Sequence, residues 1–454
     1  MTTALTIAIC KERATGEKRV AATPETVKKL IGLGARVVVE KGAGHAASYL
    51  DDAYTAAGAT LAANAAAAVK GAAVLMCVQR PDNAVLDALA PKTIVLGAVG
   101  PYDFTAALPA FKKGKLTALA MELMPRITRA QSMDILSSQA NLAGYRAVLD
   151  AAHEFGRAFP MMMTAAGTIS PARVFVMGAG VAGLQAIATA RRLGAIVSAT
   201  DVRPIAKEQV ESLGATFIMV ENEETKAAET SGGYAKEMSA AYQKAQAQLI
   251  ADTIKKQDIV ICTALIPGRP APVLVSEDMV KTMKAGSVIV DLAVTQGGNC
   301  PISESGKVVE KHGVRIIGYD NIASRIAVDS SALYARNLYN FMQSIIAKDK
   351  PAITLDPQDE IVKAIMLTHD GEAVHSLFGV PAKPATKTTA KPKAVAKSKP
   401  AAKKAEPKKP AANKAAAKPK AKPAIKSAAK SATKPVAKKP AVKAAPKTAL
   451  KSVK

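Results

Sequence analysis

The sequence lacks the residue patterns of several common classes of protein. Its four cysteines include no C-x-x-C pair. Three of them lie in apolar runs, so we expect buried thiols in a reducing cytoplasm and no disulfides. The five histidines show no H-E-x-x-H or other metal-ligand spacing. The sequence therefore predicts no metal site.

Long apolar runs are also missing. The N-terminus has no basic region before its first apolar stretch, so it does not match a signal peptide. No run of 18 or more strongly apolar residues occurs, and the alanine-rich span Ala53 to Val69 is too weakly hydrophobic to insert into a bilayer. We expect that the chain does not cross a membrane by itself.

Acidic residues are almost missing from the C-terminal part of the chain. Pro381 to Lys454 contains 23 Lys, no Arg, no Asp and one Glu, which leaves 39 basic and 36 acidic residues elsewhere. The net charge of +25 therefore belongs mainly to this segment. With 11 prolines and no aromatic residue, it cannot bury a core. We predict a disordered, Lys/Ala/Pro-rich basic tail over residues 379–454.

A glycine-rich turn stands near the middle of the sequence. The apolar run Val174 to Met177 predicts a buried parallel strand, and residues with helical spacing follow from Leu184 to Leu193. Between them, three glycines stand at G-x-G-x-x-G spacing: the first permits a tight turn, the second admits a pyrophosphate, and the third lets the helix pack on the strand. These glycines are Gly178, Gly180 and Gly183.

An acidic residue follows the glycines at the spacing of a dinucleotide site. Ile196 to Ala199 predicts the next strand, and Asp201 follows it. A carboxylate about 20 residues after the glycines accepts hydrogen bonds from the adenosine ribose hydroxyls. This favours NAD(H), although Arg203 nearby offers a partner for the 2′-phosphate of NADP. We therefore predict NAD(H) as the cofactor of this chain.

Strands and helices alternate on both sides of the glycine turn. This pattern predicts an α/β fold with two Rossmann-like parallel-sheet domains. The first domain has no phosphate-loop fingerprint, and a long helix from Ser132 to Phe155 connects it to the second. We expect an N-terminal α/β domain over residues 1–130, completed by 331–378, and an NAD(H)-binding domain over residues 131–330. A polar insertion, Glu221 to Lys236, carries one aromatic residue, Tyr234, and a loop of this length is usually functional or disordered.

Several short motifs resemble those of the alanine dehydrogenase/transhydrogenase superfamily. They include Glu17-Lys18-Arg19-Val20-Ala21-Ala22-Thr23-Pro24, the glycine turn, and Met124 to Gln139. Gly232 to Met238, Thr263 to Gly268 and Asp291-Leu292-Ala293 narrow the resemblance to the NAD(H)-binding α subunits of proton-translocating transhydrogenases, over about Ile7 to Phe378.

The resemblance implies a cleft between the two domains, a homodimer and two further kinds of subunit. A β subunit would hold NADP(H) and exchange hydride directly with NAD(H) on this chain, and a small α subunit would span the membrane. The chain would then be cytoplasmic and peripheral to the inner membrane. Hydride transfer between two nicotinamides needs orientation and exclusion of water, and no general acid or base.

The resemblance also implies roles for individual residues. The segment that holds the nicotinamide end would contain Arg126, Gln131, Asp134 and Ser137. Val181, Asp201, Val202 and Arg203 would lie along the adenosine and pyrophosphate side, and Gly233 and Leu265 would line the pocket. Tyr234 would belong to a mobile loop that closes on the bound nucleotide.

Two alternatives remain open. An alanine-dehydrogenase-like amino-acid oxidoreductase would share both domains, but related dehydrogenases carry a lysine in a Val-Lys-Glu-Pro turn and a histidine after the next strand. Here the turn is Val78-Gln79-Arg80-Pro81, and Gly97 to Gly100 contains no histidine. The second alternative is an NAD-binding protein whose basic tail holds a polyanion, either DNA or an anionic membrane.

Overall fold

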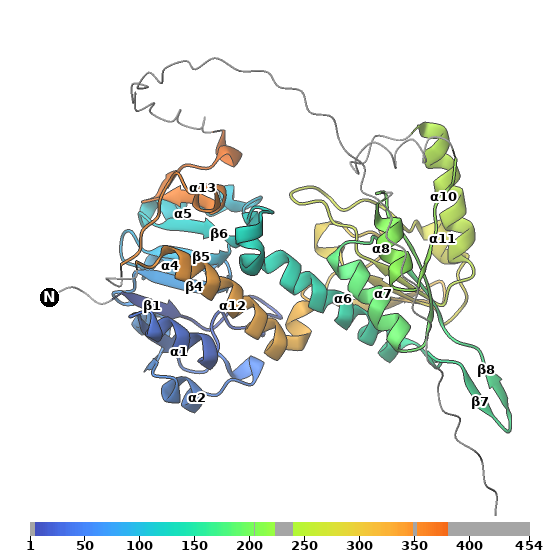
Figure 1. Cartoon of the computed structure of the whole chain (residues 1–454), viewed down its shortest axis with the longest axis horizontal. Coiled ribbons are helices and arrows are strands. Elements are labelled where there is room, and N and C mark those ends of the chain that lie inside the picture. The colour runs from blue at the N-terminus through green and yellow to red at the C-terminus, as the bar shows by residue number, and fades with distance from the viewer. Residues whose placement is uncertain (1–4, 204, 223–238, 348–351, 380–454) are drawn as a thin grey trace, which may run out of the picture. The chain divides into compact units, whose positions relative to one another are not determined.

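The structure is a computed structural model, and it describes residues 5–203, 205–222, 239–347 and 352–379. These residues form two sheets of mainly parallel strands, surrounded by helices (Figure 1). The fold is therefore the α/β arrangement with two domains that the sequence predicts. The predicted tail and most of the polar insertion lie outside the described residues.

The first sheet has eight strands in the order β17-β16-β6-β5-β4-β1-β2-β3. Strands β1 to β6 are parallel, whereas β16 pairs antiparallel with β6. The strands are β1 (Thr6–Ile9), β2 (Arg36–Glu40), β3 (Thr60–Ala62), β4 (Val74–Gln79), β5 (Ile94–Ala98), β6 (Thr117–Ala120), β16 (Met366–His369) and β17 (Glu372–Ala373).

Six helices connect or flank these strands. The first begins where the sequence predicts it, because Thr23 forms a capping box with Thr26 and proline occupies the first helical position. The helices are α1 (Pro24–Gly32), α2 (Asp51–Ala56), α3 (Ala65–Val69), α4 (Asn83–Asp87), α5 (Leu108–Lys113) and α13 (Glu360–Ile365).

The second sheet has seven strands in the order β11-β10-β9-β12-β13-β15-β14, of which only β14 is antiparallel to its neighbour. The strands are β9 (Arg173–Met177), β10 (Ile196–Thr200), β11 (Thr216–Phe217), β12 (Ile259–Cys262), β13 (Val288–Asp291), β14 (Lys307–Lys311) and β15 (Val314–Gly318). The associated helices are α7 (Val181–Arg192), α8 (Ala206–Ser212), α10 (Ala240–Ile254) and α11 (Glu277–Lys281).

Two long helices, α6 (Ile135–Glu154) and α12 (Ala327–Ile345), connect the segments of the two sheets (Figure 1). Helix α6 packs closely against α7, because a side chain at Gly144 would collide with the carbonyl of Ala182 at the start of α7. Helix α6 therefore fixes the glycine turn relative to the segment that precedes Ile135.

Each sheet is covered by apolar side chains on both faces. Along β1, Ile7 and Ile9 face one cluster, whereas Ala8 faces another. Along β9, Val174 and Val176 alternate with Phe175 and Met177 in the same way. Because both faces are buried, these strands appear in the sequence as continuous apolar runs.

Some elements differ from the prediction. The long helix begins at Ile135 and not at Ser132, because the Asp134 side chain accepts a hydrogen bond from Ser137 N and caps the helix there. The strand expected to reach Val220 ends at Phe217. Three elements were not predicted: β3, β14, and the hairpin of β7 (Met162–Thr164) and β8 (Gly167–Ile169). The domain boundaries stay a prediction.

Candidate functional site

The glycine turn has the geometry that its spacing predicts. Gly178 has φ +106°, which a residue with a side chain rarely adopts. At Gly183, a Cβ atom would collide with the carbonyl oxygen of Gly178, so only glycine lets α7 approach β9 this closely. At Gly180, no heavy atom lies within 4 Å of the position that a Cβ would take. The backbone there is open to a ligand.

Helix α7 begins at this open position. Gly180 is its N-cap residue and offers no side-chain hydrogen bond to the first turn. The N–H groups at the start of α7 and the positive end of the helix dipole are therefore available to an anion such as a pyrophosphate.

Asp201 lies at the end of the neighbouring strand β10 and is turned toward the glycine turn. Its carboxylate accepts hydrogen bonds from Ala179 N at 2.7 Å and from Arg203 N at 2.8 Å. The Arg203 side chain adds two further bonds of 2.9 and 3.0 Å. Burial opposes ionisation of Asp201, but the bonds from Arg203 and Ala179 outweigh it and lower the pKa of the carboxyl group. Asp201 is therefore negatively charged at neutral pH.

A cavity of about 480 Å³ lies between the glycine turn and the residues that precede and begin α6. It is lined by side chains from both sheets' connecting segments, including buried polar groups. The lining that matters here consists of Arg19, Glu122, Arg126, Ser137, Gln139, Gly180, Val181, Thr263, Leu265, Asn321 and Tyr334.

The segment before α6 places several of the predicted residues. Asp134 accepts a hydrogen bond from the Ser137 hydroxyl at 2.6 Å and from Ser137 N at 2.9 Å, so it fixes the orientation of Ser137. Ser137 and Arg126 line the cavity. Gln131 lies in a 3-10 turn, Thr128–Met133, and is exposed.

A buried ion pair forms one wall of the cavity. Arg19 and Glu17 make two parallel side-chain hydrogen bonds of 2.7 and 2.8 Å, and both side chains are at most 8% exposed. Arg19 also donates to Gln139 Oε1 on α6 at 2.8 Å. Burial opposes ionisation of Glu17, but the bonds from Arg19 prevail and lower its pKa to about 2.

Further donors from both sheets converge on the same carboxylate. Gln79, at the end of β4, donates to Glu17 at 3.1 Å. Asn321, in the segment after β15, donates to Glu17 at 2.7 Å. Ser324 lies within 3.1 Å of the other Glu17 oxygen. Glu17 therefore ties the two domains together at the cavity.

Two more buried polar groups line the cavity. Glu122 accepts hydrogen bonds from Gly100 N at 2.8 Å and Val99 N at 3.3 Å, and burial raises its pKa. The Tyr334 hydroxyl donates to the carbonyl of Cys77 at 2.9 Å and accepts from Ala98 N at 2.9 Å. Burial raises the pKa of Tyr334 as well, so its hydroxyl stays protonated.

The structure brings part of the predicted site together. Five predicted residues line the cavity: Arg126, Ser137, Gly180, Val181 and Leu265. Asp134 contacts Ser137, whereas Gly178, Gly183, Asp201, Val202 and Arg203 lie at the adjoining strand ends without lining the cavity. Gln131 also does not line it. Gly233 and Tyr234 lie outside the described residues.

Sequence reasoning missed the polar wall of the cavity. Glu17 and Arg19 belong to a motif that the resemblance rests on, yet nothing in the local sequence indicates that they are buried. Their partners Gln139 and Asn321 lie 120 and 304 residues away. The only available signal was the charged Glu17-Lys18-Arg19 directly before an apolar run.

Metal sites and membrane-spanning helices are both missing from the part of the chain that the structure describes. The described residues contain no group of three or more His, Cys, Asp or Glu side chains that could hold a metal ion. Among the helices in the described ranges, none is long and apolar enough to span a membrane.

Comparison with known proteins gives consistent matches over both sheets. Residues 8–143 match the family "Alanine dehydrogenase/PNT, N-terminal domain", and residues 147–376 match "Alanine dehydrogenase/PNT, C-terminal domain".

Individual relatives cover the same region. An NAD(P) transhydrogenase subunit alpha protein of Rhodospirillum rubrum is 59% identical over 374 residues, which are 81% of this chain and 97% of that protein. The protein of the same name from Rickettsia prowazekii is 46% identical, covering 82% of this chain and 97% of its own length. A crystal structure of transhydrogenase from Sinorhizobium meliloti superimposes with a TM-score of 0.75 at 54% identity, over 81% of this chain and 100% of that chain.

Proposed function

We propose that this chain, which belongs to the alanine dehydrogenase/PNT family, is the NAD(H)-binding α subunit of a proton-translocating transhydrogenase. The observation that carries the proposal is the cavity of about 480 Å³, which lies between the open glycine turn at Gly180 and the segment of Arg126 and Ser137. A dinucleotide needs such an anion site at one end and a polar pocket at the other.

The residues at the glycine turn fit the adenosine and pyrophosphate part of NAD(H). The free N–H groups at the start of α7 suit the pyrophosphate, and the missing side chain at Gly180 leaves room for it. The ionised Asp201 would accept hydrogen bonds from the ribose hydroxyls, with Val202 and Arg203 beside it. Val181 and Leu265 would provide apolar contacts along the cavity.

The segment before α6 would hold the nicotinamide end. When bound, the nicotinamide supplies the carbon that gives or takes a hydride. Arg126 and Ser137 would bind and orient that end from the cavity wall, and Asp134 holds Ser137 in place. Gln131 would act in the reacting geometry, and Gly233 and Tyr234 would close over the site.

The proposed partner is a β subunit that holds NADP(H) and receives or returns the hydride directly. Small membrane-spanning α and β subunits would couple this transfer to proton movement, and the chain would be cytoplasmic and peripheral to the inner membrane. Such a reaction asks the protein to align two rings and exclude water.

The same site argues against an amino-acid oxidoreductase. That reaction needs an acid or base for the substrate amine, at the positions that Gln79 and Arg80 occupy here. Gln79 donates to Glu17 at 3.1 Å, and Arg80 is paired with Asp103 at 3.1 Å. Both side chains therefore serve the fold.

We also propose a homodimer that forms through the β7–β8 hairpin. The hairpin is a separate two-stranded sheet, and an isolated pair of strands is only marginally stable in water. Met161, Met162, Met163 and Ile169 are exposed there, with Met163 reaching 78%. Apolar side chains gathered on such an arm are typical of a protein interface.

The basic tail supports a second proposal, contact with a polyanion such as DNA or an anionic membrane. Its 23 lysines would bind phosphate groups by releasing counterions, without recognising a sequence. This contact would be additional to nucleotide binding and independent of it.

The nucleotide site can be tested by comparing two glycines. At both Gly180 and Gly156 the position of a Cβ is unobstructed, so valine should be accommodated at either. Gly180→Val should weaken NADH binding at least about tenfold, because its side chain would occupy the space of the pyrophosphate. Gly156→Val should bind NADH like the unmodified chain. Equal NADH affinity of the two variants in a fluorescence titration would contradict the proposed site.

A further inference from the structure

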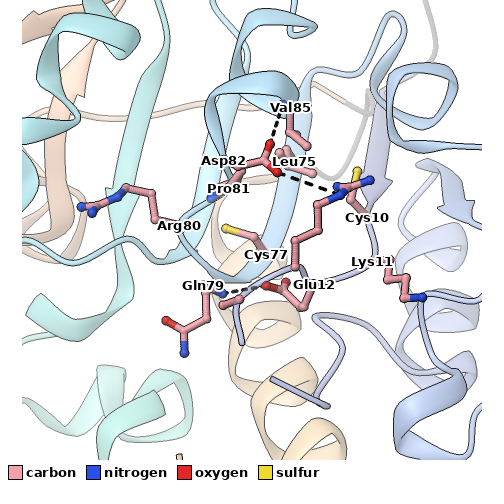
Figure 2. A pocket seen from close by; sticks show the side chains of 12 residues that line it. Cys10, Lys11, Glu12, Leu75, Cys77, Gln79, Arg80, Pro81, Asp82 and Val85 are labelled. Atoms are coloured by element: carbon pink, nitrogen blue, oxygen red, sulfur yellow. Dashed lines mark hydrogen bonds and ion pairs between the residues drawn. The ribbon is translucent and has the colours of Figure 1, made fainter. Parts of the chain in front are cut away.

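A second pocket, of about 220 Å³, lies in the N-terminal domain (Figure 2). It is lined by the residues that follow β1, Cys10 to Ala14, and by residues at the end of β4 and beyond it, including Cys77 and Asp82. Strands β1 and β4 are neighbours, while the chain runs from β1 through β2 and β3 on the other side. This is the point at which the strand order of the sheet reverses, where parallel α/β sheets bind their ligands.

The pocket is distinct from the nucleotide cavity. The two share no lining residue. Its volume is several times the roughly 30 Å³ that one water molecule takes up in the liquid, so it admits a small organic molecule but no dinucleotide.

A buried carboxylate in this pocket has no cation beside it. Glu12 accepts hydrogen bonds from Val78 N at 2.6 Å and from Gln79 N at 3.1 Å. Among the described residues, no Lys, Arg or His nitrogen comes within 4 Å of its oxygens; Arg13 is paired with Glu40 and approaches Asp82, and Arg19 is paired with Glu17. Burial raises the pKa of Glu12 to about 7. A cationic ligand would compensate this charge.

The remaining lining suits a ligand with a short apolar part. Leu75, Val85 and the thiols of Cys10 and Cys77 are all buried. Figure 2 shows these side chains between Glu12 and Asp82 in this view, whereas Lys11 and Arg80 point away from the space between them. Glu12 and Asp82 together outnumber the single cation Arg13 at this pocket, so its charge favours a cation.

We propose that this pocket binds a small primary ammonium compound, with the ammonium group on the Glu12 carboxylate and a short apolar chain against Leu75, Val85 and the two thiols. The three N–H donors of an ammonium group can serve Glu12 and Asp82 at once. No feature of the nucleotide site is needed for this binding.

Calorimetric titration of the full chain at pH 8 tests the proposal, with n-propylammonium chloride as the probe. We expect saturable binding of one equivalent, and no such binding of 1-propanol, which lacks the charge, or of potassium chloride, which lacks the apolar chain. A response to propylammonium no larger than that to potassium chloride would overturn the proposal.

Three variants locate the binding. Glu12→Gln should weaken propylammonium binding at least about tenfold, and Val85→Phe should do the same by filling the pocket. Glu122→Gln is the matched control, because Glu122 is also a buried carboxylate held by two backbone N–H groups, but it lines the nucleotide cavity. Binding that survives both Glu12→Gln and Val85→Phe, or that is lost in Glu122→Gln, would contradict the assignment. A cooperative thermal transition checks that each variant folds, independently of NADH binding.

Discussion

Asn321 Nδ2 donates a hydrogen bond of 2.7 Å to the Glu17 carboxylate. Glu17 precedes α1 of the first domain, and Asn321 follows β15 of the second. Because Glu17 also neutralises the buried Arg19, this contact joins the electrostatics of the cavity wall to the docking of the two domains.

Glu17→Gln should destabilise the chain strongly. It leaves the Arg19 guanidinium buried without its counter-charge, a change that typically costs about 3–5 kcal/mol. Asn321→Ala removes one hydrogen bond to a charged group and should cost about 1.5–3 kcal/mol. Urea unfolding measures both. Arg129→Met, which breaks the exposed pair with Asp359, is the control and should change the midpoint little. A Glu17→Gln midpoint like that of Arg129→Met would contradict the role given to this ion pair.

The two buried glutamates predict opposite effects of pH on stability. Glu12 has a pKa of about 7 in the folded chain, against an ordinary value of 4.5. Between these values the folded state binds more protons than the unfolded state, so the free energy of unfolding should fall as pH rises from 4.5 to 7, by on the order of 2–3 kcal/mol. Glu12→Gln cannot titrate and should lack this decline.

Glu17 gives the reverse slope at lower pH. Its pKa of about 2 lies below the ordinary 4.5, so its contribution is complete above pH 4.5 and is lost as pH falls toward 2. Urea unfolding at a series of pH values separates the two windows. Identical pH profiles for the unmodified chain and Glu12→Gln between pH 4.5 and 7 would show that Glu12 does not titrate there.

Local patterns predicted the parts of the site that local geometry determines. The positive φ of Gly178 and the close approach at Gly183 follow from the spacing of the glycines, because a strand, a turn and a helix place them without help from distant residues. Alternating strands and helices predicted the two parallel sheets for the same reason.

Long-range contacts determine the rest, and no local pattern contains them. Arg19 is buried only because α6 brings Gln139 to it from 120 residues away. The ammonium pocket depends on the neighbouring positions of β1 and β4, which the order of elements along the chain does not reveal. The hairpin with Met163 was missed because an exposed element shows no alternation of buried and exposed side chains.

The chain should prefer NADH to NADPH. The ionised Asp201 would face the 2′-phosphate of NADPH with like charge, a repulsion of about 1–3 kcal/mol, or roughly 5- to 150-fold in affinity. Asp201→Asn should narrow this ratio, whereas Arg203→Gln, which removes the neighbouring cation, should widen it. Fluorescence titrations with both nucleotides measure the ratio, and equal affinities of the unmodified chain would contradict the assignment of Asp201.

The tail should be separable from nucleotide binding. Removing residues 381–454 deletes 23 lysines and one glutamate but none of the described residues. NADH affinity should therefore persist, while retention on DNA or anionic vesicles should fall and lose its dependence on salt. Retention that is unchanged by the truncation would place the polyanion site on residues before 381.

Direct hydride transfer is the central claim. The chain should be mixed with the NADP(H)-binding β subunit, NADP⁺ and NADH that carries deuterium at the transferred position of the nicotinamide, and the NADPH formed should be analysed by mass spectrometry. Gln131→Asn serves as the matched variant and should slow the transfer more than it weakens NADH binding. We predict that the deuterium appears in NADPH and none in water; deuterium released to the solvent, or NADPH without label, would contradict direct transfer.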